Sequence, residues 1–480
     1  MFNSLVQKRV VVIGGGISGL ACAFQLRRKG INVRVLESSN RAGGVIRSER
    51  VDGFLLEHAA TCLFNYLPEV DFFCRNLGLE SEQVYRQEAA RRRYLLRDGQ
   101  PMPVPMDVGG FIRTGLISWR GKLRLLLEPF IPRGAVRGEQ ESVAGFISRR
   151  FGSEIYARAI EPYISGTLAG DGDRACLRST FSQFAALEDD YGSILKGAVA
   201  RKMRGMRSAS CNARVFSFRE GMSALPDAIV AHLGADFLPG RRVNGIERCG
   251  PRWEVEAQAD DGVVERYEAD AVLVATPAYA AALLLRGLSR DLGELLAGIT
   301  YAPMVVTHLG YERSAVGHAM DGIGCLVPKC ETGFDLLGSL WPGTLFAGRA
   351  PAGRVMFMNY LGGARSPGML ERSDDELLER SQENLHRMFG VSGQPVLTRI
   401  TRHQRALPQY NLGHQMFLRD VENHLALLPG IFLAGNYLRG VSVRVSITQG
   451  EQMAERIKKV LQASSVRVAP LESLLRARSV

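Results

Sequence analysis

The sequence predicts an α/β protein (α+β overall) in which one parallel sheet is assembled from separated parts of the chain. Three observations lead to this prediction: a glycine-rich turn between a β-branched run and a helical segment near the N-terminus, two buried-strand runs much further along, and alternating strand patterns between them. The 480 residues are 46% hydrophobic and 23% charged, which is typical of a globular protein with more than one core.

The N-terminal segment has the order strand, glycine turn, helix, strand. Residues 9–13 are a β-branched run that suits a buried parallel strand, and residues 20–26 continue as a helix that stops near Gly30. The turn between them contains Gly14, Gly16 and Gly19 at the GxGxxG spacing, with Ile17 and Ser18 between the last two glycines. The first glycine allows a tight turn, the second lets backbone N–H groups approach a pyrophosphate at a helix N-terminus, and the third lets the helix pack close to the sheet.

The residues at the end of the second strand indicate which ligand the glycine turn binds. Residues 33–36 lead to Glu37, where an acid is expected to hold a ribose hydroxyl, so the segment reads as a Rossmann-like dinucleotide site. The alternative is a glycine-rich structural turn. Arg41, Gly43 and Gly44 follow at once and place a cation and two glycines where the chain could pass the pyrophosphate. Nicotinamide-binding domains do not usually need this extension, so the predicted cofactor is FAD.

The rest of the chain predicts three domains. Residues 253–257 and 263–267 alternate like a hairpin, residues 270–277 read as a buried strand that rejoins the nucleotide sheet, and residues 431–436 read as another, followed by a helix over 445–461. An amphipathic helical pattern runs from 141 to 164, and apolar strands alternate with glycine turns from about 300 to 410. We therefore expect a discontinuous FAD-binding domain (1–85, 215–300 and 415–465), a helical, membrane-facing domain (90–210), a mixed-sheet substrate domain (300–415) and a C-terminal tail (466–480).

Charge and cysteine content limit the partners. Eight cysteines are scattered without a CxxC pair and eight histidines are dispersed, so we expect no metal. The net charge is +11, and basic residues alternate with apolar ones over 109–137 (Arg113, Arg120, Lys122, Arg124, Arg133 and Arg137), with a second basic run at 201–214. Docking on anionic lipid is one interpretation and a solvated helix face is the other. No cleaved signal or membrane-spanning run is expected, which predicts a cytoplasmic protein that is either soluble or peripheral at the inner face of the membrane.

Several segments together resemble the protoporphyrinogen oxidases, oxygen-dependent FAD enzymes of the flavin amine oxidase and phytoene desaturase group. The matching segments are residues 161–171, 177–181, 216–226, 349–351 and 407–414, and the match covers nearly the whole chain. The chain departs from the family pattern at His58, Ala59 and Ala60, where the family has a Gly-Pro pair near the flavin, and again at Arg444 and residues 446–448.

The resemblance implies FAD-dependent oxidation of protoporphyrinogen IX to protoporphyrin IX with O₂ as acceptor, in three rounds that each release hydrogen peroxide. It implies that Arg97 pairs with a substrate propionate and that Leu326, Leu340 and Tyr360 sandwich the macrocycle. The alternative interpretation of Arg97 is a solvent-facing arginine in a turn, and the alternative for the three other residues is core packing. It extends the cofactor site to Val243, Gly435, Asn436, Val441 and Val443, and names no catalytic side chain.

Two other functions stay open from the sequence. An amine oxidase is less supported, since no lysine lies in residues 303–307 and Asn436 stands where those enzymes tend to have glutamate. A non-catalytic flavoprotein scaffold is the third interpretation. The expected partners are a tetrapyrrole and O₂, an anionic membrane surface and a second copy of the chain, and not nucleic acid.

Overall fold

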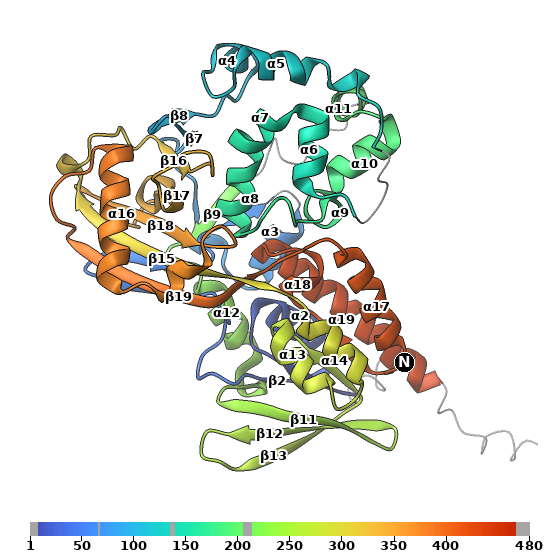
Figure 1. The fold of residues 1–480 in the computed structure, drawn as a ribbon. Helices are drawn as coiled ribbons and strands as arrows, with labels where there is room; N and C mark the ends of the chain where they lie inside the picture. Colours follow the sequence, from blue (N-terminus) through green and yellow to red (C-terminus); the bar gives the residue numbers. More distant parts are fainter. Residues whose placement is uncertain (1–7, 66–67, 135–139, 205–213, 467–480) are drawn as a thin grey trace, which may run out of the picture.

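The structure is a computed structural model that describes residues 8–65, 68–134, 140–204 and 214–466 (Figure 1). Its first part is built around a five-stranded parallel sheet. Its strand order is β10-β2-β1-β14-β20. The five strands are β1 (Arg9–Ile13), β2 (Asn32–Leu36), β10 (Phe237–Leu238), β14 (Ala271–Val274) and β20 (Ile431–Leu433). Val272 pairs with both Val11 and Ile431, so segments more than 250 residues apart form one sheet. This confirms the predicted assembly from separated parts.

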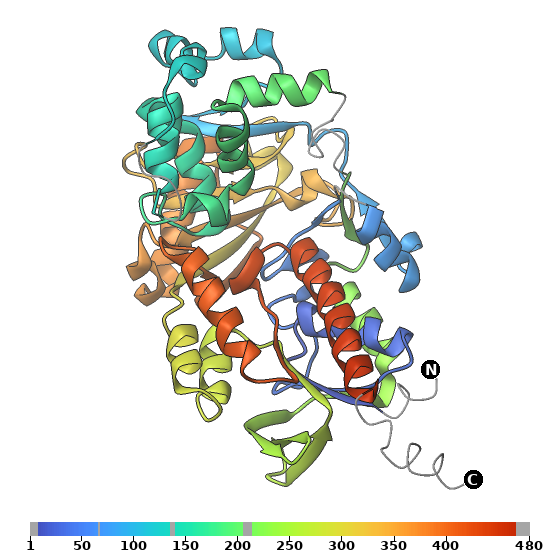
Figure 2. The same ribbon diagram turned by 90° about the vertical axis from the view of Figure 1, so that its right-hand side faces the viewer.

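Both faces of this sheet are buried, which is why its strands are so rich in β-branched residues. Val10 and Val12 face one core, and Val11 and Ile13 face the other. The first core is closed by α2 (Ile17–Arg28), α3 (Pro68–Asn76), α12 (Ala224–Leu233) and α19 (Val443–Val466). The second is closed by α13 (Ala278–Leu285), α14 (Arg290–Ala297) and α17 (His414–Ala426). Figure 2 shows α19 as the long red helix on the near side.

Helices α2 and α19 pack so closely that a glycine is needed between them. A Cβ on Gly450 would lie 2.6 Å from the carbonyl oxygen of Ser18. The C-terminal helix is longer than the predicted 445–461, and the residues beyond Val466, the expected tail, lie outside the described residues.

An antiparallel three-stranded sheet extends from the same part of the chain. It contains β11 (Arg241–Cys249), β12 (Arg252–Ala259) and β13 (Val264–Ala269), and it confirms the predicted hairpin. The register of β11 shifts between Val243 and Gly245, which marks a β-bulge, and a bulge of this kind bends its strand.

The second part is a seven-stranded mixed sheet with order β19-β15-β18-β17-β16-β7-β8. Its strands are β19 (Leu397–Pro408), β15 (Tyr301–Glu312), β18 (Arg354–Gly362), β17 (Leu336–Leu340), β16 (Gly322–Leu326), β7 (Arg92–Arg97) and β8 (Gln100–Pro103). Only β16 and β7 pair in parallel, and α16 (Asp374–Phe389) covers one face. Residues 92–103, which were expected to open the helical domain, therefore form a hairpin in this sheet.

Several short elements complete the strands and helices of these two parts. They are β3 (Ser48–Val51), β4 (Phe54–Glu57), β5 (Leu63–Asn65), β6 (Gln83–Tyr85), β9 (Arg214–Phe218), α15 (Pro342–Leu345) and α18 (Asn436–Arg439). Strands β3 and β4 form a hairpin, and β9 pairs with both β5 and β6.

A helical layer forms the end of the molecule opposite β11–β13 (Figure 1). Its helices are α4 (Val108–Arg113), α5 (Trp119–Leu126), α6 (Val143–Phe151), α7 (Ser153–Ile155), α8 (Glu161–Leu168), α9 (Leu177–Thr180), α10 (Ser182–Tyr191) and α11 (Ile194–Met203). The amphipathic pattern expected from 141 to 164 is not one helix, because Gly152 adopts a φ of 97° and residues Tyr156–Ile160 form a π-helical turn. The fully buried Arg150 pairs with Glu128 and Glu188 and joins α6 to α10.

Candidate cofactor and substrate site

The glycine turn has the geometry that its spacing predicts. Gly14 has a φ of 108°, which disfavours any side chain, and its backbone N–H donates to the carbonyl oxygen of Leu36 at 2.8 Å. A Cβ on Gly19 would overlap the carbonyl oxygen of Gly14 and lie 3.1 Å from Val12 Cγ1. These two glycines therefore serve the packing of the turn.

Gly16 differs from them, because a Cβ there would meet no protein atom within 4 Å. It sits at the N-terminus of α2, directly before Ile17 and the buried Ser18, and bridges to Gly43, whose N–H donates to Gly15 at 2.8 Å. Nearby, the buried hydroxyl of Thr276 has no hydrogen-bond partner within the described part of the chain. An open glycine edge at a helix N-terminus fits the pyrophosphate of a dinucleotide.

The carboxylate of Glu37 closes onto this turn. Its Oε2 accepts from the Gly15 N–H at 2.7 Å, and its Oε1 accepts from the N–H and the hydroxyl of Ser39, both at 2.8 Å. The predicted acid is thus beside the turn, as expected from its place at the end of β2. Its contact with a ribose hydroxyl stays a prediction.

The guanidinium of Arg41 shapes the loop that follows. It donates to the carbonyl oxygens of Ala42 at 3.1 Å, Ile46 at 3.0 Å and Gly44 at 2.5 Å. Burial lowers the pKa of Arg41. Gly43 and Gly44 both have positive φ, 98° and 59°, and a Cβ on Gly44 would lie 3.4 Å from Gly16 Cα. The loop therefore lies against the open glycine, while a direct contact of Arg41 with the cofactor stays a prediction.

The C-terminal residues of the predicted cofactor site lie around the start of α18 and α19. Gly435 N–H donates to Gln449 Oε1 at 2.8 Å, and the carbonyl oxygen of Asn436 accepts from the Tyr410 hydroxyl. Val441 and Val443 stand at the N-terminal end of α19. Val243 lies at the bulge of β11, whose Arg241 N–H donates to the Glu37 carbonyl at 2.8 Å.

The predicted substrate residues share one face of the seven-stranded sheet. Leu326 and Tyr360 both pair with Gly338 from opposite sides, and Leu340 follows Gly338 by two residues. Directly paired residues point to the same side of a sheet, as do residues two apart. The structure thus brings the three apolar side chains together, half-buried, around a position that has no side chain of its own.

Arg97 lies on the same face, on β7, which is one strand in from the edge strand β8. Its strand neighbour Leu95 pairs with Leu326, and Arg97 follows Leu95 by two residues. Its side chain is 22% exposed, and Nη1 donates to the Gly115 carbonyl, which precedes the buried Leu116. Arg97 is therefore placed beside the apolar residues, and its bond to a propionate stays a prediction.

Polar residues that sequence reasoning did not select lie on this face as well. They include the buried His308 and the half-buried Thr401, because Val306 pairs with both Tyr360 and Thr401 and His308 follows Val306 by two residues. Burial lowers the pKa of His308 to about 4 and raises the pKa of Glu57 to about 7. No local pattern marks these residues, since only the pairing of distant strands puts them together.

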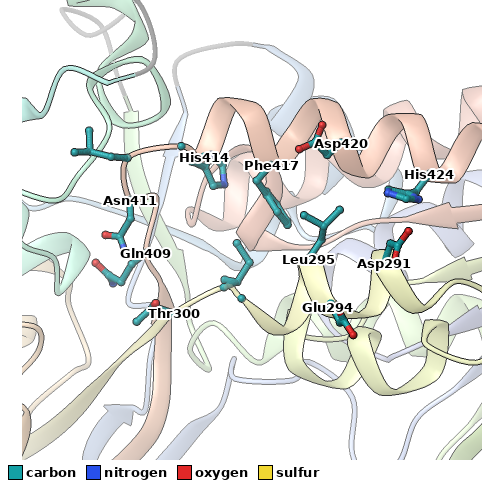
Figure 3. Close-up of a pocket in the computed structure, with 14 residues that line it drawn as sticks. Asp291, Glu294, Leu295, Thr300, Gln409, Asn411, His414, Phe417, Asp420 and His424 are labelled. Carbon is teal, nitrogen blue, oxygen red and sulfur yellow. The ribbon is translucent and has the colours of Figure 1, made fainter.

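A surface cleft of about 680 Å³ lies elsewhere, between α14 and α17 (Figure 3). Acidic side chains and His424 line it, and Leu295 and Phe417 contribute apolar surface. It contains none of the predicted site residues. Separately, within the described residues no group of three or more His, Cys, Asp or Glu side chains is arranged to hold a metal ion.

Comparison with known proteins shows the class and the family of this chain. The fold and the glycine edge define an FAD-dependent oxidoreductase of the α/β type. Residues 17–458 match the model of the flavin containing amine oxidoreductase family, and the chain belongs to this family.

The mitochondrial protoporphyrinogen oxidase of Nicotiana tabacum is 30% identical over 486 residues, which cover 95% of this chain and 96% of the relative. The coproporphyrinogen III oxidase of Bacillus subtilis (strain 168) is 28% identical over 464 residues, covering 93% and 97%. A solved structure from Exiguobacterium sp. 255-15 has a TM-score of 0.78 at 24% identity, covering 94% of this chain and 98% of the other, which shows a shared fold.

Proposed function

We propose that this enzyme oxidises a porphyrinogen to a porphyrin, with protoporphyrinogen IX as substrate and O₂ as electron acceptor. The observation that carries the proposal is the single sheet face on which Leu326, Leu340 and Tyr360 lie together, with Arg97 on the neighbouring strand β7. The substrates in the names of the relatives from tobacco and Bacillus subtilis support the same class of reaction.

The residues of this face suit a flexible apolar macrocycle with acidic side chains. The half-buried apolar side chains of Leu326, Leu340 and Tyr360 bind the ring by excluding water. The guanidinium of Arg97 offers a planar fork that matches a carboxylate. Bound FAD supplies the two-electron oxidation and passes the electrons to O₂.

No lysine serves this reaction from the adjoining strand. Strand β15 contains no lysine, and its residues on the face of Tyr360 include Ala302, Met304, Val306 and His308. This favours a porphyrinogen over an amine, because an amine oxidase would be expected to have a lysine on this strand near the flavin.

The test is a steady-state assay with two substrates. FAD-loaded protein under air receives protoporphyrinogen IX or coproporphyrinogen III, which differ in the number of carboxylates, and porphyrin fluorescence is followed with time. We expect a higher kcat/KM for protoporphyrinogen and loss of turnover when oxygen is removed. A higher kcat/KM for coproporphyrinogen would correct the substrate, and turnover of neither would overturn the function.

We also propose that the face formed by α4, α5 and the following turn docks on an anionic membrane surface. Large apolar side chains are exposed there: Val108 77%, Ile112 67%, Trp119 69%, Leu126 67% and Phe130 81%. Arg113 and Arg120 are exposed among them, which gives charge complementarity to acidic lipid. Within the residues described, helices that combine enough length and apolarity to cross a bilayer are absent.

Not every predicted cation is free for this role. Lys122 donates to the carbonyls of Ile112 and Thr114 at 2.7 Å, and Arg124 donates to the carbonyl of Arg150 at 3.1 Å. Both therefore hold the layer together. Arg137 lies outside the described residues, as does Arg207 of the second basic run.

Liposome sedimentation tests the docking face with neutral and anionic vesicles at low and high salt. We expect co-sedimentation with anionic vesicles at low salt that Trp119→Glu abolishes, because that residue is exposed among the cations. Leu283→Glu, at a 76% exposed leucine on α13, is the matched control. Equal recovery of the unsubstituted protein in all four supernatants would leave the solvated-face interpretation.

A further inference from the structure

His58, where the chain departs from the family pattern, bridges two parts of the structure. Its Nδ1 lies 3.0 Å from Thr401 Oγ1 on β19, and its Nε2 lies 3.0 Å from Glu49 Oε2 on β3. A carboxylate only accepts, so Nε2 carries the proton and Nδ1 accepts from the Thr401 hydroxyl. Both ring nitrogens are thus used, one toward the β3–β4 hairpin and one toward the seven-stranded sheet.

Two more histidines hold the backbone at the same point. His308 Nε2 donates to the carbonyl oxygen of Glu57 at 3.1 Å, and His403 Nε2 donates to that of His58 at 2.8 Å. They come from the adjacent strands β15 and β19. Four hydrogen bonds from three histidine rings therefore converge on residues 57 and 58, where β4 ends.

The turn that these bonds fix lies between the two halves of the candidate site. On one side Thr401 and His403 belong to the sheet face that carries Tyr360. On the other side, Ala60 packs against the core cluster that contains Val443, and the turn leads into β5, which packs against α19. Movement of this turn would change how the substrate face meets the FAD-binding core.

We propose that His58, His308 and His403 form a latch that sets the position of the substrate face relative to the bound flavin, with His58 as its central positioning residue. This rests on the proposed function only in taking the face of Tyr360 as the substrate face. The latch itself concerns how the sheet is attached to the FAD-binding part, whichever substrate is used.

The test compares His58→Leu, Thr401→Val and the double variant with a matched control. The control is His386→Leu, because His386 Nδ1 also makes a hydrogen bond, to the carbonyl oxygen of Val391 at 2.9 Å, but this bond lies at the C-terminal end of α16 and does not join two parts of the structure. FAD affinity is measured on apoprotein by flavin fluorescence, thermal unfolding by circular dichroism, and kcat and KM on FAD-saturated protein.

We expect His58→Leu to weaken FAD binding about 10-fold and to lower kcat at saturating FAD, because two hydrogen bonds are lost, one of them to a carboxylate. Adding Thr401→Val to His58→Leu should change FAD affinity and kcat little further, since the two residues share one hydrogen bond. His58→Gln, which keeps a donor and an acceptor, should recover part of both. His386→Leu should lower the unfolding temperature while FAD affinity and kcat stay within twofold.

Unchanged FAD affinity and kcat in His58→Leu, with only the loss of unfolding temperature that the control also shows, would overturn the latch. FAD affinity is measured without substrate. If the FAD affinities of the variants follow the expected order but the unsubstituted protein oxidises no porphyrinogen, the latch stands and the proposed function is refuted.

Discussion

Replacing Gly16 by alanine separates cofactor binding from folding. Gly16 has φ −72° and ψ 166°, which alanine adopts without strain, and the new Cβ meets no protein atom within 4 Å. Apoprotein stability should therefore stay the same or rise by about 0.4–1 kcal/mol through the unfolded state. The methyl group would occupy the space where the pyrophosphate approaches the backbone N–H groups. One lost charge-assisted hydrogen bond is worth about 1.5–3 kcal/mol, or about 10- to 150-fold in the Kd of FAD.

Gly19→Ala is the matched comparison, because its Cβ would overlap the Gly14 carbonyl and lie 3.0 Å from Ala275 Cβ. Overpacking of this kind costs about 1–3 kcal/mol of stability. Urea unfolding of both apoproteins and FAD titration by fluorescence give the two quantities. An unchanged Kd in Gly16→Ala, or equal loss of stability in both variants, would refute the assignment of this edge as the pyrophosphate site.

Two further predictions concern the polar groups of the site. Arg97→Ala should mainly raise KM, by about 30-fold or more if a desolvated charge pair worth about 2–5 kcal/mol is lost, with Arg97→Lys intermediate; unchanged kinetics would remove Arg97 from the site. The folded-state pKa of His308, about 4, is below its ordinary 6.5, so its contribution to stability is lost as pH falls from about 6.5 to 4, by about 3 kcal/mol. The folded-state pKa of Glu57, about 7, is above its ordinary 4.5, so its contribution is lost as pH rises from about 4.5 to 7. Between about pH 4.5 and 6.5 the two groups therefore change the free energy of unfolding in opposite directions as pH rises. Urea unfolding of the apoprotein should show that His308→Gln, which keeps only the Glu57 contribution, loses stability with rising pH, and that Glu57→Gln, which keeps only the His308 contribution, loses stability with falling pH. Parallel pH curves for the two variants would contradict both pKa shifts.

The nucleotide half of the fold could be predicted because its signals are local. The strand from Arg9, the glycine spacing and Glu37 lie within 30 residues and act on each other directly. The later strands β14 and β20 could be placed because a buried parallel strand needs a continuous apolar run.

The parts that could not be predicted depend on pairing between distant segments. Residues 92–103 join the seven-stranded sheet only because β7 pairs with β16, more than 220 residues later. The same holds for His308 and His403, which look like ordinary strand residues until their register brings them to the end of β4. The break at Gly152 and the π-helical turn after it interrupt a pattern that is continuous in the sequence.

Some predicted site residues bond a protein group in the structure, while their predicted ligand contact stays a prediction. Arg41 was selected as a cation for the pyrophosphate, and in the structure it donates to its own loop. A composition pattern cannot distinguish these uses of a guanidinium, because carbonyl oxygens and phosphates both accept from it.

Anaerobic mixing of FAD-loaded protein with protoporphyrinogen IX tests the central claim most directly. If the enzyme oxidises the macrocycle at its flavin, the visible absorbance of the oxidised flavin should bleach within seconds, about the timescale of an ordinary kcat. Admission of air should then restore the absorbance as porphyrin fluorescence increases. Protein that binds FAD but keeps its full absorbance, and forms porphyrin no faster than a protein-free control after air is admitted, would contradict the proposed function.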